Sequence, residues 1–551
     1  ITIESYRTIN ENKRQMGRLK TFLRLFFLAT ITAALVGCGK KKVVQENVLR
    51  INFAKEPLSI DPRKAADPAT CRLIYMIYDG LTRTLPSGSV ALCLAESVEV
   101  TSDRKQYKFL LKKTNWSNGA PIVARDFEYA WKSVLNPSFP APNAFLLYSI
   151  KNARLAKMGK VPLSSVGIKA INDRELVVQL EKPIPYFLEL VSFCSFFPIS
   201  EKEELQNPDW ASITTGSSPT CGTFEIEYWK HASDLFLRKS QYNWNTDNVS
   251  LDKVEISFVE NHLTALQMFE KGKLDWMEAI FGSTDMMFAF IKSGHHHKLN
   301  KGGTFFVTFN MNDEIFNNIN MRKAFAYAID RQAIAENISN KLIANHLIPP
   351  IFRYQESSID FFKDATPELA KAYFEKGLTE LGLTRDEFPS FTYYYLNYSL
   401  QKQVAQALQN QWRETFGINI ELQGLEMKLF LTRLFNRDYS IAQSGIIAQY
   451  SDPMNFLERF QHRDDNKNYP GWESPLFNQK LSEALNIPNP KLRQIKYDEA
   501  EMILINDMPI APIYYTHDLY IMDENIQGVE VTPTGVVDFR NVRIKQRTKK
   551  E

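Results

Sequence analysis

The sequence lacks the short motifs that mark several large classes of enzyme. It contains no His-Glu-x-x-His zinc motif, no Gly-x-Ser-x-Gly nucleophile elbow and no phosphate-binding loop ending in Gly-Lys-Ser or Gly-Lys-Thr. Ser102 and Lys105 stand three residues apart in "TSDRKQY", but this is a polar turn without a Lys-Thr-Gly partner. A serine nucleophile needs a base and a preorganised oxyanion hole. We therefore expect a protein that is not an enzyme and that uses no metal or organic cofactor.

Histidine and cysteine are both scarce, and neither shows the spacing of a metal site. The chain has 8 histidines and 5 cysteines, without a Cys-x-x-Cys pair or a Cys/His zinc pattern. Three histidines adjoin in "SGHHHKLN" (293–300). Adjacent side chains on an extended loop point alternately to opposite sides, so three in a row rarely reach one ion. We interpret this stretch as a solvated loop.

An apolar run long enough to cross a membrane is missing as well. Residues 25–36 form an uncharged run of 12, preceded by Arg18, Lys20 and Arg24. A transmembrane helix needs about 20 apolar residues, whereas a signal peptide has a basic start and a shorter apolar core. We expect residues 16–37 to be a signal peptide that starts at Met16. Residues 1–15 would then be a mis-started or non-native upstream segment.

The apolar run ends in Leu35-Val36-Gly37-Cys38, which resembles the lipobox of bacterial lipoproteins. That resemblance implies that the Cys38 thiol carries an acyl chain such as palmitate and that residues 38–50 are a polar tether. Each buried methylene of such a chain contributes about 0.8 kcal/mol to membrane binding. We expect a lipid-anchored protein of the bacterial cell envelope, in the periplasm or on the cell surface. An ordinary signal peptide with a coincidental cysteine is the alternative.

The chain also lacks a large excess of charge of one sign, with 66 basic and 63 acidic residues. Removing residues 1–37 removes six basic and two acidic residues, which lowers the net charge from +3 to −1. This balance excludes the basic footprint of a nucleic-acid-binding protein. Hydrophobic residues make up 44% of the chain and aromatic residues 12%, enough for a large body of two or more domains.

Four cysteines follow the expected anchor, at positions 71, 93, 194 and 221. An even number in an oxidising compartment permits two disulfides, with three possible connectivities. Proximity along the chain favours Cys71 with Cys93 and Cys194 with Cys221.

Short strands and helices alternate along the whole chain. The clearest unit is 391–423, where "FTYYYLN" predicts a strand, "SLQKQVAQALQNQWRETFG" a helix ending at Gly417, and "INIELQ" a second strand. This order is typical of a right-handed βαβ unit. We interpret the apolar stretch "FLELVSFCSFFPIS" (187–200) as a buried strand with its approach. The chain therefore reads as α/β or mixed α+β, and the lack of an obvious linker suggests domains built from interleaved segments.

The stretch "NWSNGAPIVARDFEYAWKSVLNP" (115–137) is similar to the signature of the family 5 solute-binding proteins, the peptide- and nickel-binding subunits of ABC importers. Further blocks of the same resemblance follow in order. They are "GIKAINDRELVVQL" (167–180) with "PIPYF" (183–187), "ALQMFEKGKLDWM" (265–277), "FNNINMRKAFAYAIDRQAI" (316–334), "YSDPMNFL" (450–457) and "MPIAPIYY" (508–515). We interpret the turn at Trp116 and the helix between Arg322 and Arg331 as scaffold rather than binding site.

The resemblance implies a two-lobed periplasmic-binding-protein fold with an extra inserted lobe and discontinuous domains. Lobe I would comprise 39–78, 201–303 and 517–551, the inserted lobe II 79–200, and lobe III 304–516. The lobes would close on an oligopeptide like a hinged trap and deliver it to a permease with its ATPase subunits. We expect the protein to be a monomer.

The resemblance also places candidate ligand-binding residues. Peptide-binding members hold an extended peptide through its main chain, and an aspartate in lobe III captures its α-ammonium group. Here that position is Gln449. The other family positions correspond to Gln443, Ala66, Asn143 and Thr308, with Ile446 on the same segment as Gln443.

The charged anchors of the family are therefore missing from this sequence. A desolvated ammonium–carboxylate pair is worth roughly 2–5 kcal/mol by truncation, and Gln449 cannot supply the charge. Asp67 and Asp452 are the nearest acids that could replace it. Otherwise the ligand lacks a free amine at that point, as a modified or cell-wall-derived peptide would, or it is not a peptide. Ordinary oligopeptides remain the main hypothesis. Muropeptides, or a non-peptide ligand such as a nickel complex with the histidines of 293–300 as candidates, stay open as alternatives.

Overall fold

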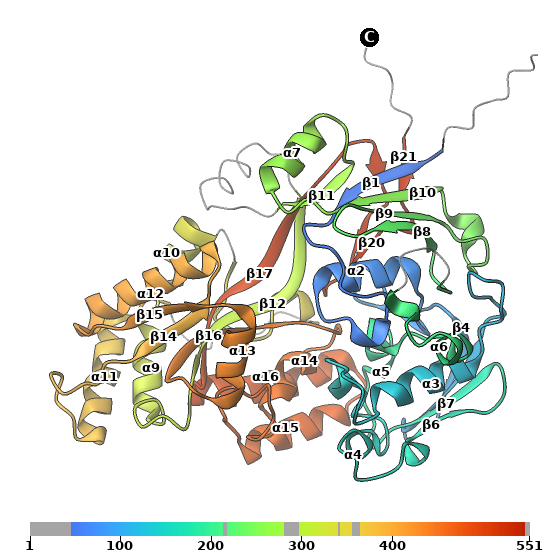
Figure 1. The fold of residues 1–551 in the computed structure, drawn as a ribbon. Coiled ribbons are helices and arrows are strands. Elements are labelled where there is room, and N and C mark those ends of the chain that lie inside the picture. Colours follow the sequence, from blue (N-terminus) through green and yellow to red (C-terminus); the bar gives the residue numbers. More distant parts are fainter. Residues whose placement is uncertain (1–45, 213–217, 280–296, 340–341, 355–363, 546–551) are drawn as a thin grey trace, which may run out of the picture. The chain divides into compact units, whose positions relative to one another are not determined.

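The computed structural model describes residues 46–212, 218–279, 297–339, 342–354 and 364–545 (Figure 1). The predicted signal peptide, Cys38 and most of the tether lie outside these ranges. No helix within the described ranges is long and apolar enough to cross a membrane. Strands and helices mix throughout, which confirms the predicted α/β class.

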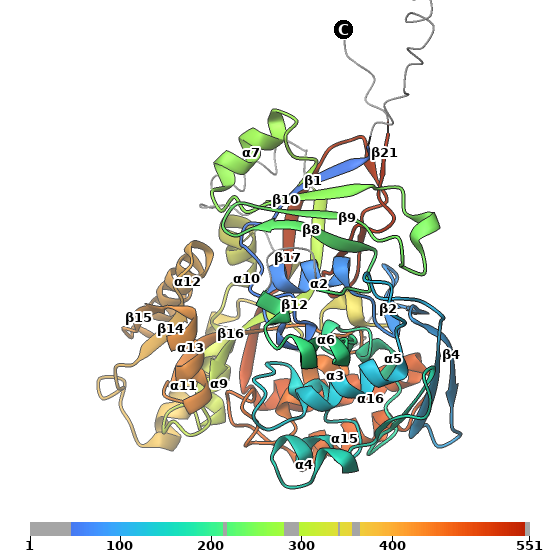
Figure 2. The ribbon, with the colours of Figure 1, turned by 45° about the vertical axis from the view of Figure 1, so that its right-hand side comes forward.

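The largest sheet among the described residues has 11 strands, with two long antiparallel strands, β12 and β17, at its centre (Figure 1). β16, β14 and β15 follow on one side, and β11, β1, β10, β9 and β8 on the other, where Figure 2 shows the last three one after another. The strands are β1 (Val48–Asn52), β8 (Phe224–Lys230), β9 (Asp234–Lys239), β10 (Lys253–Ser257), β11 (Trp276–Ala279), β12 (His297–Phe309), β13 (Leu342–Ile343, paired with β17), β14 (Thr392–Leu396), β15 (Glu421–Leu425), β16 (Ile441–Ile447) and β17 (Ile510–Met522).

The two central strands are irregular at one place. The register between β12 and β17 shifts between Asn300 and Gly303, and Gly303 lies opposite Thr516. The boundaries expected between lobes I and III, at 303/304 and 516/517, fall at this shift. An irregular ladder has fewer regular hydrogen bonds to resist bending than an unbroken one.

Gly302 at this shift is expected to be intolerant of any side chain. Its φ is +42°, and an added Cβ would lie 2.4 Å from both the Pro533 carbonyl oxygen and Phe352 Cζ. We expect Gly302→Ala to lower the free energy of unfolding by about 2–5 kcal/mol, because backbone strain and overpacking add. Gly382→Ala is the control, since Gly382 has φ +67° but nothing within 4 Å of its added Cβ. Chemical denaturation of both variants tests this, and equal losses would contradict it.

The predicted βαβ unit is confirmed. β14 and β15 are parallel neighbours joined by α12 (Ser399–Phe416), which ends at Gly417 with φ +75°. Trp412 of α12 is fully buried, and its Nε1 donates to the Phe325 carbonyl at 3.0 Å. Helices α9 (Ile319–Tyr327), α10 (Arg331–Ile334) and α11 (Pro367–Leu381) contribute to the same core cluster.

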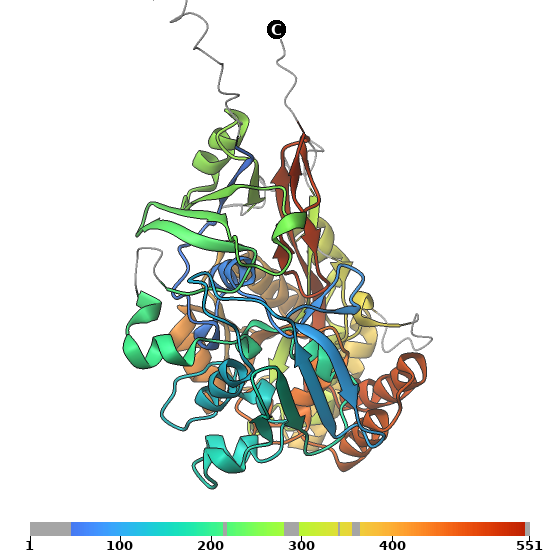
Figure 3. The same ribbon diagram turned by 90° about the vertical axis from the view of Figure 1, so that its right-hand side faces the viewer.

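A separate four-stranded antiparallel sheet is built entirely from the segment 79–200 expected as an insertion (Figure 3). Its strands are β4 (Ala95–Val100), β5 (Gln106–Leu111), β6 (Ile168–Ala170) and β7 (Glu175–Gln179), and α3 (Ala124–Val134) belongs to the same segment. The Trp116 turn packs into the core of this segment, where Trp116 is buried and its Nε1 donates to Asp126 at 3.1 Å. Burial raises the pKa of Asp126 to about 6.

The expectation of a strand within 187–200 is wrong. This stretch forms α5 (Phe187–Leu190) and the short 3-10 helix η4 (Cys194–Phe196). Its apolar side chains are buried in helical turns, and Trp131 Nε1 donates to the Phe196 carbonyl at 2.7 Å. A short apolar run carries no periodicity that separates a buried strand from a buried helical turn.

The remaining elements surround these two sheets. They are α2 (Pro68–Ile77), β2 (Thr82–Thr84), β3 (Val90–Leu92), α4 (Ala153–Lys157), α6 (Glu201–Gln206), α7 (His262–Glu270), α13 (Met427–Asn436), α14 (Met454–Leu457), α15 (Pro475–Leu485), α16 (Pro490–Asp507), β18 (Ile526–Gln527), β19 (Glu530–Val531), β20 (Val537–Asp538) and β21 (Arg543–Ile544).

Candidate functional site

A cavity of about 530 Å³ collects residues from segments far apart in the sequence. The start of α2, the end of β16, the middle of β12 and β17, and the first residues of α12 all contribute to its wall. The lining residues are Ala65, Ala66, Asp67, Pro68, Cys71, Arg72, Tyr75, Asn143, Phe193, Phe305, Leu400, Gln401, Ile447, Ala448, Gln449, Tyr514, Thr516, Thr534, Gly535, Val536 and Val537. This volume suits a small organic ligand or a short peptide segment.

Four of the predicted ligand-binding residues meet in this cavity: Ala66, Asp67, Asn143 and Gln449. Asn143 connects the other parts of the group. Its Nδ2 donates to the Ala65 carbonyl at 2.8 Å, and its Oδ1 accepts from Gln449 Nε2 at 3.0 Å. The side-chain amide of Asn143 thus links the segment of Ala65 to Gln449 through hydrogen bonds rather than through charges.

Two acceptor oxygens of this group have no hydrogen-bond partner among the residues that the structure describes. They are Oδ2 of Asp67 and Oε1 of Gln449, and both are buried. The other carboxylate oxygen of Asp67 accepts from the Thr70 N–H at 2.9 Å and so caps α2. A buried acceptor without a partner costs about 1–3 kcal/mol, and more when it is charged. A donor supplied by a ligand would remove that cost.

Asp452, the other candidate for a replacement acid, does not line this cavity. It is fully buried, and its carboxylate accepts from Arg493 Nη2 at 3.1 Å and from the Met454 N–H at 2.9 Å. Its charge is therefore used inside the core. Asp67 is the acid in the cavity wall.

Gln443, Ile446 and Thr308 do not line the cavity, contrary to the expectation from the resemblance. Side chains alternate along β16, so Ile447 reaches the cavity while the buried Ile446 points to the opposite face. Gln443 Oε1 accepts from the Leu396 N–H at 3.4 Å, and the Thr308 hydroxyl lies 3.3 Å from that of Tyr439. These polar groups are satisfied within the sheet.

Several lining residues were not predicted from the sequence. Phe305 and Tyr514 stack at 5.3 Å between ring centroids on the neighbouring central strands. Arg72 pairs with Glu278, and its guanidinium lies 5.0 Å from the centroid of Phe53. No local motif marks these residues, because long-range strand pairing brings them together. Apolar and aromatic groups therefore form much of the wall around the polar group at Asn143.

The four cysteines in the described residues are free thiols. Cys71 Sγ lies 3.9 Å from Cys194 Sγ, not beside Cys93. Cys221 Sγ instead accepts from the Asp79 N–H at 3.4 Å. The pairing favoured by chain proximity therefore differs from the arrangement in the fold.

No metal site is apparent among the described residues, because no group of three His, Cys, Asp or Glu side chains is placed to hold an ion. Of the three adjacent histidines, only His297 lies within the described ranges. It is exposed and stacks on Tyr520 at 5.0 Å.

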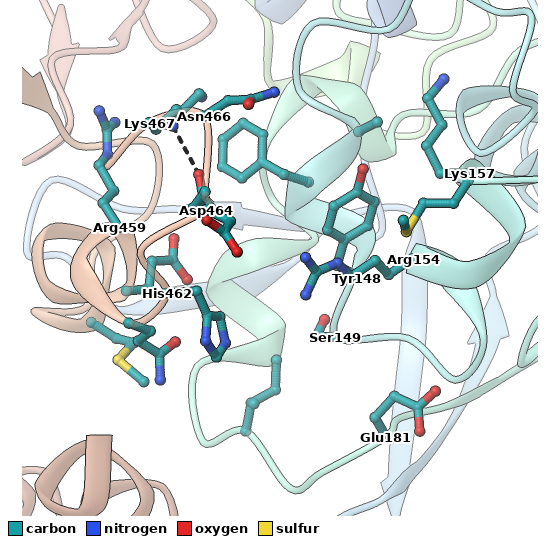
Figure 4. Close-up of a pocket in the computed structure, with 18 of the residues that line it drawn as sticks. Tyr148, Ser149, Arg154, Lys157, Glu181, Arg459, His462, Asp464, Asn466 and Lys467 are labelled. Carbon is teal, nitrogen blue, oxygen red and sulfur yellow. Dashed lines mark hydrogen bonds between the residues drawn. The ribbon is translucent and has the colours of Figure 1, made fainter. Parts of the chain in front are cut away.

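A larger cavity, of about 890 Å³, shares no lining residue with the first. Figure 4 shows Arg459 and Lys467 on one wall, with Tyr148 and Arg154 on the wall opposite. Lys467 Nζ lies 3.5 Å from the centroid of Phe145. Burial, together with the nearby positive charge of Arg459, lowers the pKa of Lys467 to about 7.

Lys467 is therefore expected to react with an acylating reagent as a neutral amine near pH 7. Its labelling rate should reach half of its plateau near that pH, because the fraction of free amine rises as pH passes the pKa. Lys108 is the control, since its hydrogen bond with Glu175 raises its pKa. The labelling rate of Lys108 should still rise with pH in alkaline buffer, where the rate of Lys467 has reached its plateau. Residue-resolved mass spectrometry measures both rates, and parallel pH profiles would contradict the prediction.

Known proteins resemble this chain over most of its length. The model of the bacterial extracellular solute-binding proteins, family 5, matches residues 89–468. The oligopeptide-binding protein OppA of Bacillus subtilis is 35% identical over 516 residues, which cover 92% of this chain and 95% of that protein. The dipeptide-binding protein DppE of the same organism is 31% identical, with 95% of this chain and 99% of that protein covered.

A solved structure supports the fold. The murein tripeptide binding protein MppA of Escherichia coli superposes with a TM-score of 0.78 at 23% identity, over 91% of this chain and 99% of that chain. The sequence blocks, the family match and this shared fold agree. The chain belongs to the bacterial extracellular solute-binding proteins of family 5.

Proposed function

We propose that this protein is the substrate-binding subunit of an ABC importer and that it captures oligopeptides in the 530 Å³ cavity. The single observation that carries this assignment is a pair of buried acceptors on the wall around Asn143, Asp67 Oδ2 and Gln449 Oε1, which find no partner in the described part of the chain. The free amino group of a peptide supplies N–H donors and a positive charge. Asp67 provides the charge that Gln449 does not.

The wall beyond this polar group fits a peptide of mixed side chains. The stacked pair Phe305 and Tyr514 offers apolar surface, and Thr516 adds a hydroxyl that has no hydrogen-bond partner within the described ranges. Recognition through the main chain together with an apolar wall tolerates many side chains. Oligopeptides therefore fit this cavity better than a metal complex does.

The division into lobes is part of the proposal. Lobe I (39–78, 201–303, 517–551) and lobe III (304–516) would bend about β12 and β17 at the register shift beside Gly303. Closure around the ligand would present the loaded protein to a permease with its ATPase subunits. Lobe II (79–200) carries its own sheet and contributes Asn143 to the cavity.

We also propose that the mature protein is a monomer and is held in the cell envelope by an acyl chain on Cys38. The support for the anchor is the sequence at residues 35–38 and the basic and apolar segments before it. Mass spectrometry of the native membrane fraction tests it. A mature N-terminus without an acyl chain would exclude the anchor.

Calorimetry with matched peptides tests the main proposal. A pool of short peptides with free amino termini is titrated into the protein and compared with the same pool after N-acetylation. Binding of the free amines alone supports an ordinary oligopeptide receptor in which Asp67 carries the charge. Equal binding of both pools would exclude the amino group as an anchor and favour modified or cell-wall peptides. Binding of neither pool would exclude oligopeptides as the ligand.

A further inference from the structure

Cys71 and Cys194 are 123 residues apart in sequence, yet their sulfur atoms lie 3.9 Å apart. Cys71 is on α2, and Cys194 is the first residue of η4. Cys194 is buried, whereas Cys71 is partly exposed and lines the ligand cavity. A disulfide requires a sulfur–sulfur distance of about 2.05 Å, so the gap is within reach of small side-chain and backbone adjustments.

The backbone around this pair is already held together. Tyr75, one turn after Cys71, donates from its hydroxyl to the Ser192 carbonyl at 3.3 Å. Its ring packs edge-on against Phe197 at 5.4 Å between centroids. Contacts on both sides of Cys194 therefore fix α2 against η4 without any covalent bond. Cross-linking the two sulfurs would strengthen an arrangement that exists before oxidation.

The family to which the chain belongs works outside the cytoplasm, where disulfides form and persist. We propose that Cys71 and Cys194 form a disulfide that ties α2 to η4 at the wall of the ligand cavity. The bond closes a loop that contains almost all of the inserted segment 79–200. Cys71 lies shortly before the start of that segment and Cys194 lies near its end, so the bond links its two ends.

The reaction is an ordinary thiol–disulfide exchange with a low-molecular-weight disulfide or a disulfide oxidoreductase as oxidant. Cys71, the more accessible thiol, attacks the oxidant as a thiolate, and one reduced thiol leaves. Cys194 then attacks the mixed disulfide at Cys71 and releases the second thiol. One disulfide is reduced to two thiols while one forms in the protein, and the two protons pass to the released thiolates. Burial raises the pKa of Cys194 well above its usual value, which favours Cys71 as the first attacker.

The bond would also fix one face of the ligand site. Cys71 and Tyr75 lie on the same face of α2, Asp67 is the N-cap of this helix, and all three line the cavity. A disulfide at Cys71 would hold Asp67, four residues earlier, in a fixed position relative to η4. The cross-link does not depend on the identity of the ligand.

The test uses the full chain, without variants at first. The folded, reduced protein is incubated with oxidised glutathione, alkylated, digested and analysed by mass spectrometry. We expect a linked peptide pair containing Cys71 and Cys194 that disappears after reduction. Free, alkylated Cys71 and Cys194 after oxidation would overturn the proposal, as would linkage of either one to a different cysteine.

Variants provide a second readout that does not involve peptide binding. Oxidation should raise Tm of the natural protein, because the closed loop restricts the unfolded chain. We expect no such rise in Cys71→Ser and an unchanged rise in Cys93→Ser, since Cys93 lies buried elsewhere. An equal rise in both variants would overturn the assignment. If the linked Cys71–Cys194 product forms but the protein binds no oligopeptide, the result contradicts the transport proposal and leaves the disulfide proposal standing.

Discussion

Replacing Asp67 by asparagine is expected to weaken binding of a free-amine peptide by about 30-fold or more. A buried charge pair is worth at least about 2 kcal/mol by truncation, which corresponds to that factor in Kd. The carboxylate oxygen without a partner, Oδ2, would become part of an uncharged amide. The measurement is calorimetric titration of one peptide into the natural protein and into Asp67→Asn.

The same substitution separates charge from structure. Asparagine still offers an oxygen to the Thr70 N–H, so the cap of α2 is retained and Tm should change little. The N-acetylated form of the same peptide has no ammonium group, and the substitution should leave its affinity unchanged.

Asp103→Asn is the matched control for Asp67→Asn. Asp103 also accepts from a backbone N–H, that of Lys105 at 3.1 Å, but it lies in an exposed turn away from the cavity. Its replacement should alter neither affinity. If Asp67→Asn binds the free-amine peptide as tightly as the natural protein does, Asp67 is not the anchor.

Much of the fold could be predicted because the signals were local. The unit at 391–423 has a helix of 18 residues with an apolar face and a glycine stop, and its flanking strands pair in parallel. Residues 187–200 have no such signal. Their helical turns are fixed by contacts with α3, such as the hydrogen bond from Trp131 to Phe196, and these contacts are invisible along the sequence.

The candidate site could be predicted only in part, for a different physical reason. Asp67, Asn143 and Gln449 were placed as candidates through the resemblance to the family, and the structure brings them together. On β16, whether a residue reaches the cavity depends on the face of the sheet that it occupies. A shift of one residue along the strand separates Ile446 in the core from Ile447 in the cavity.

The contact between cysteines of distant segments was missed. The neighbour of Cys71 is Cys194, 123 residues away, rather than the next cysteine in the chain. Proximity along the chain is a weak guide when a whole sheet is inserted between two contacting segments. The same insertion places Asn143 beside Ala65.

The second large effect is expected at Arg63, which holds the segment before the cavity wall. Its guanidinium is buried and donates to both oxygens of Asp61 at 2.8 and 2.9 Å, and to both oxygens of Glu204 at 2.6 and 2.9 Å. We expect Arg63→Met to lower the free energy of unfolding by about 3–5 kcal/mol, because it leaves the carboxylate of Asp61 buried without its partner. Equilibrium denaturation in urea measures the loss.

Arg125→Met is the matched comparison, because Arg125 makes the same kind of two-point contact with the same helix, α6. It donates to the two oxygens of Glu201 at 2.9 and 3.0 Å, but 55% of its side chain is exposed. Water solvates both partners of an exposed pair, so the loss should stay below about 1 kcal/mol. The contact with a glutamate of α6 is alike in the two cases, whereas Arg63 is buried and also holds Asp61. Similar losses would mean that burial of the Arg63 pair does not set its contribution, and that Ala65–Asp67 is held in place by other contacts.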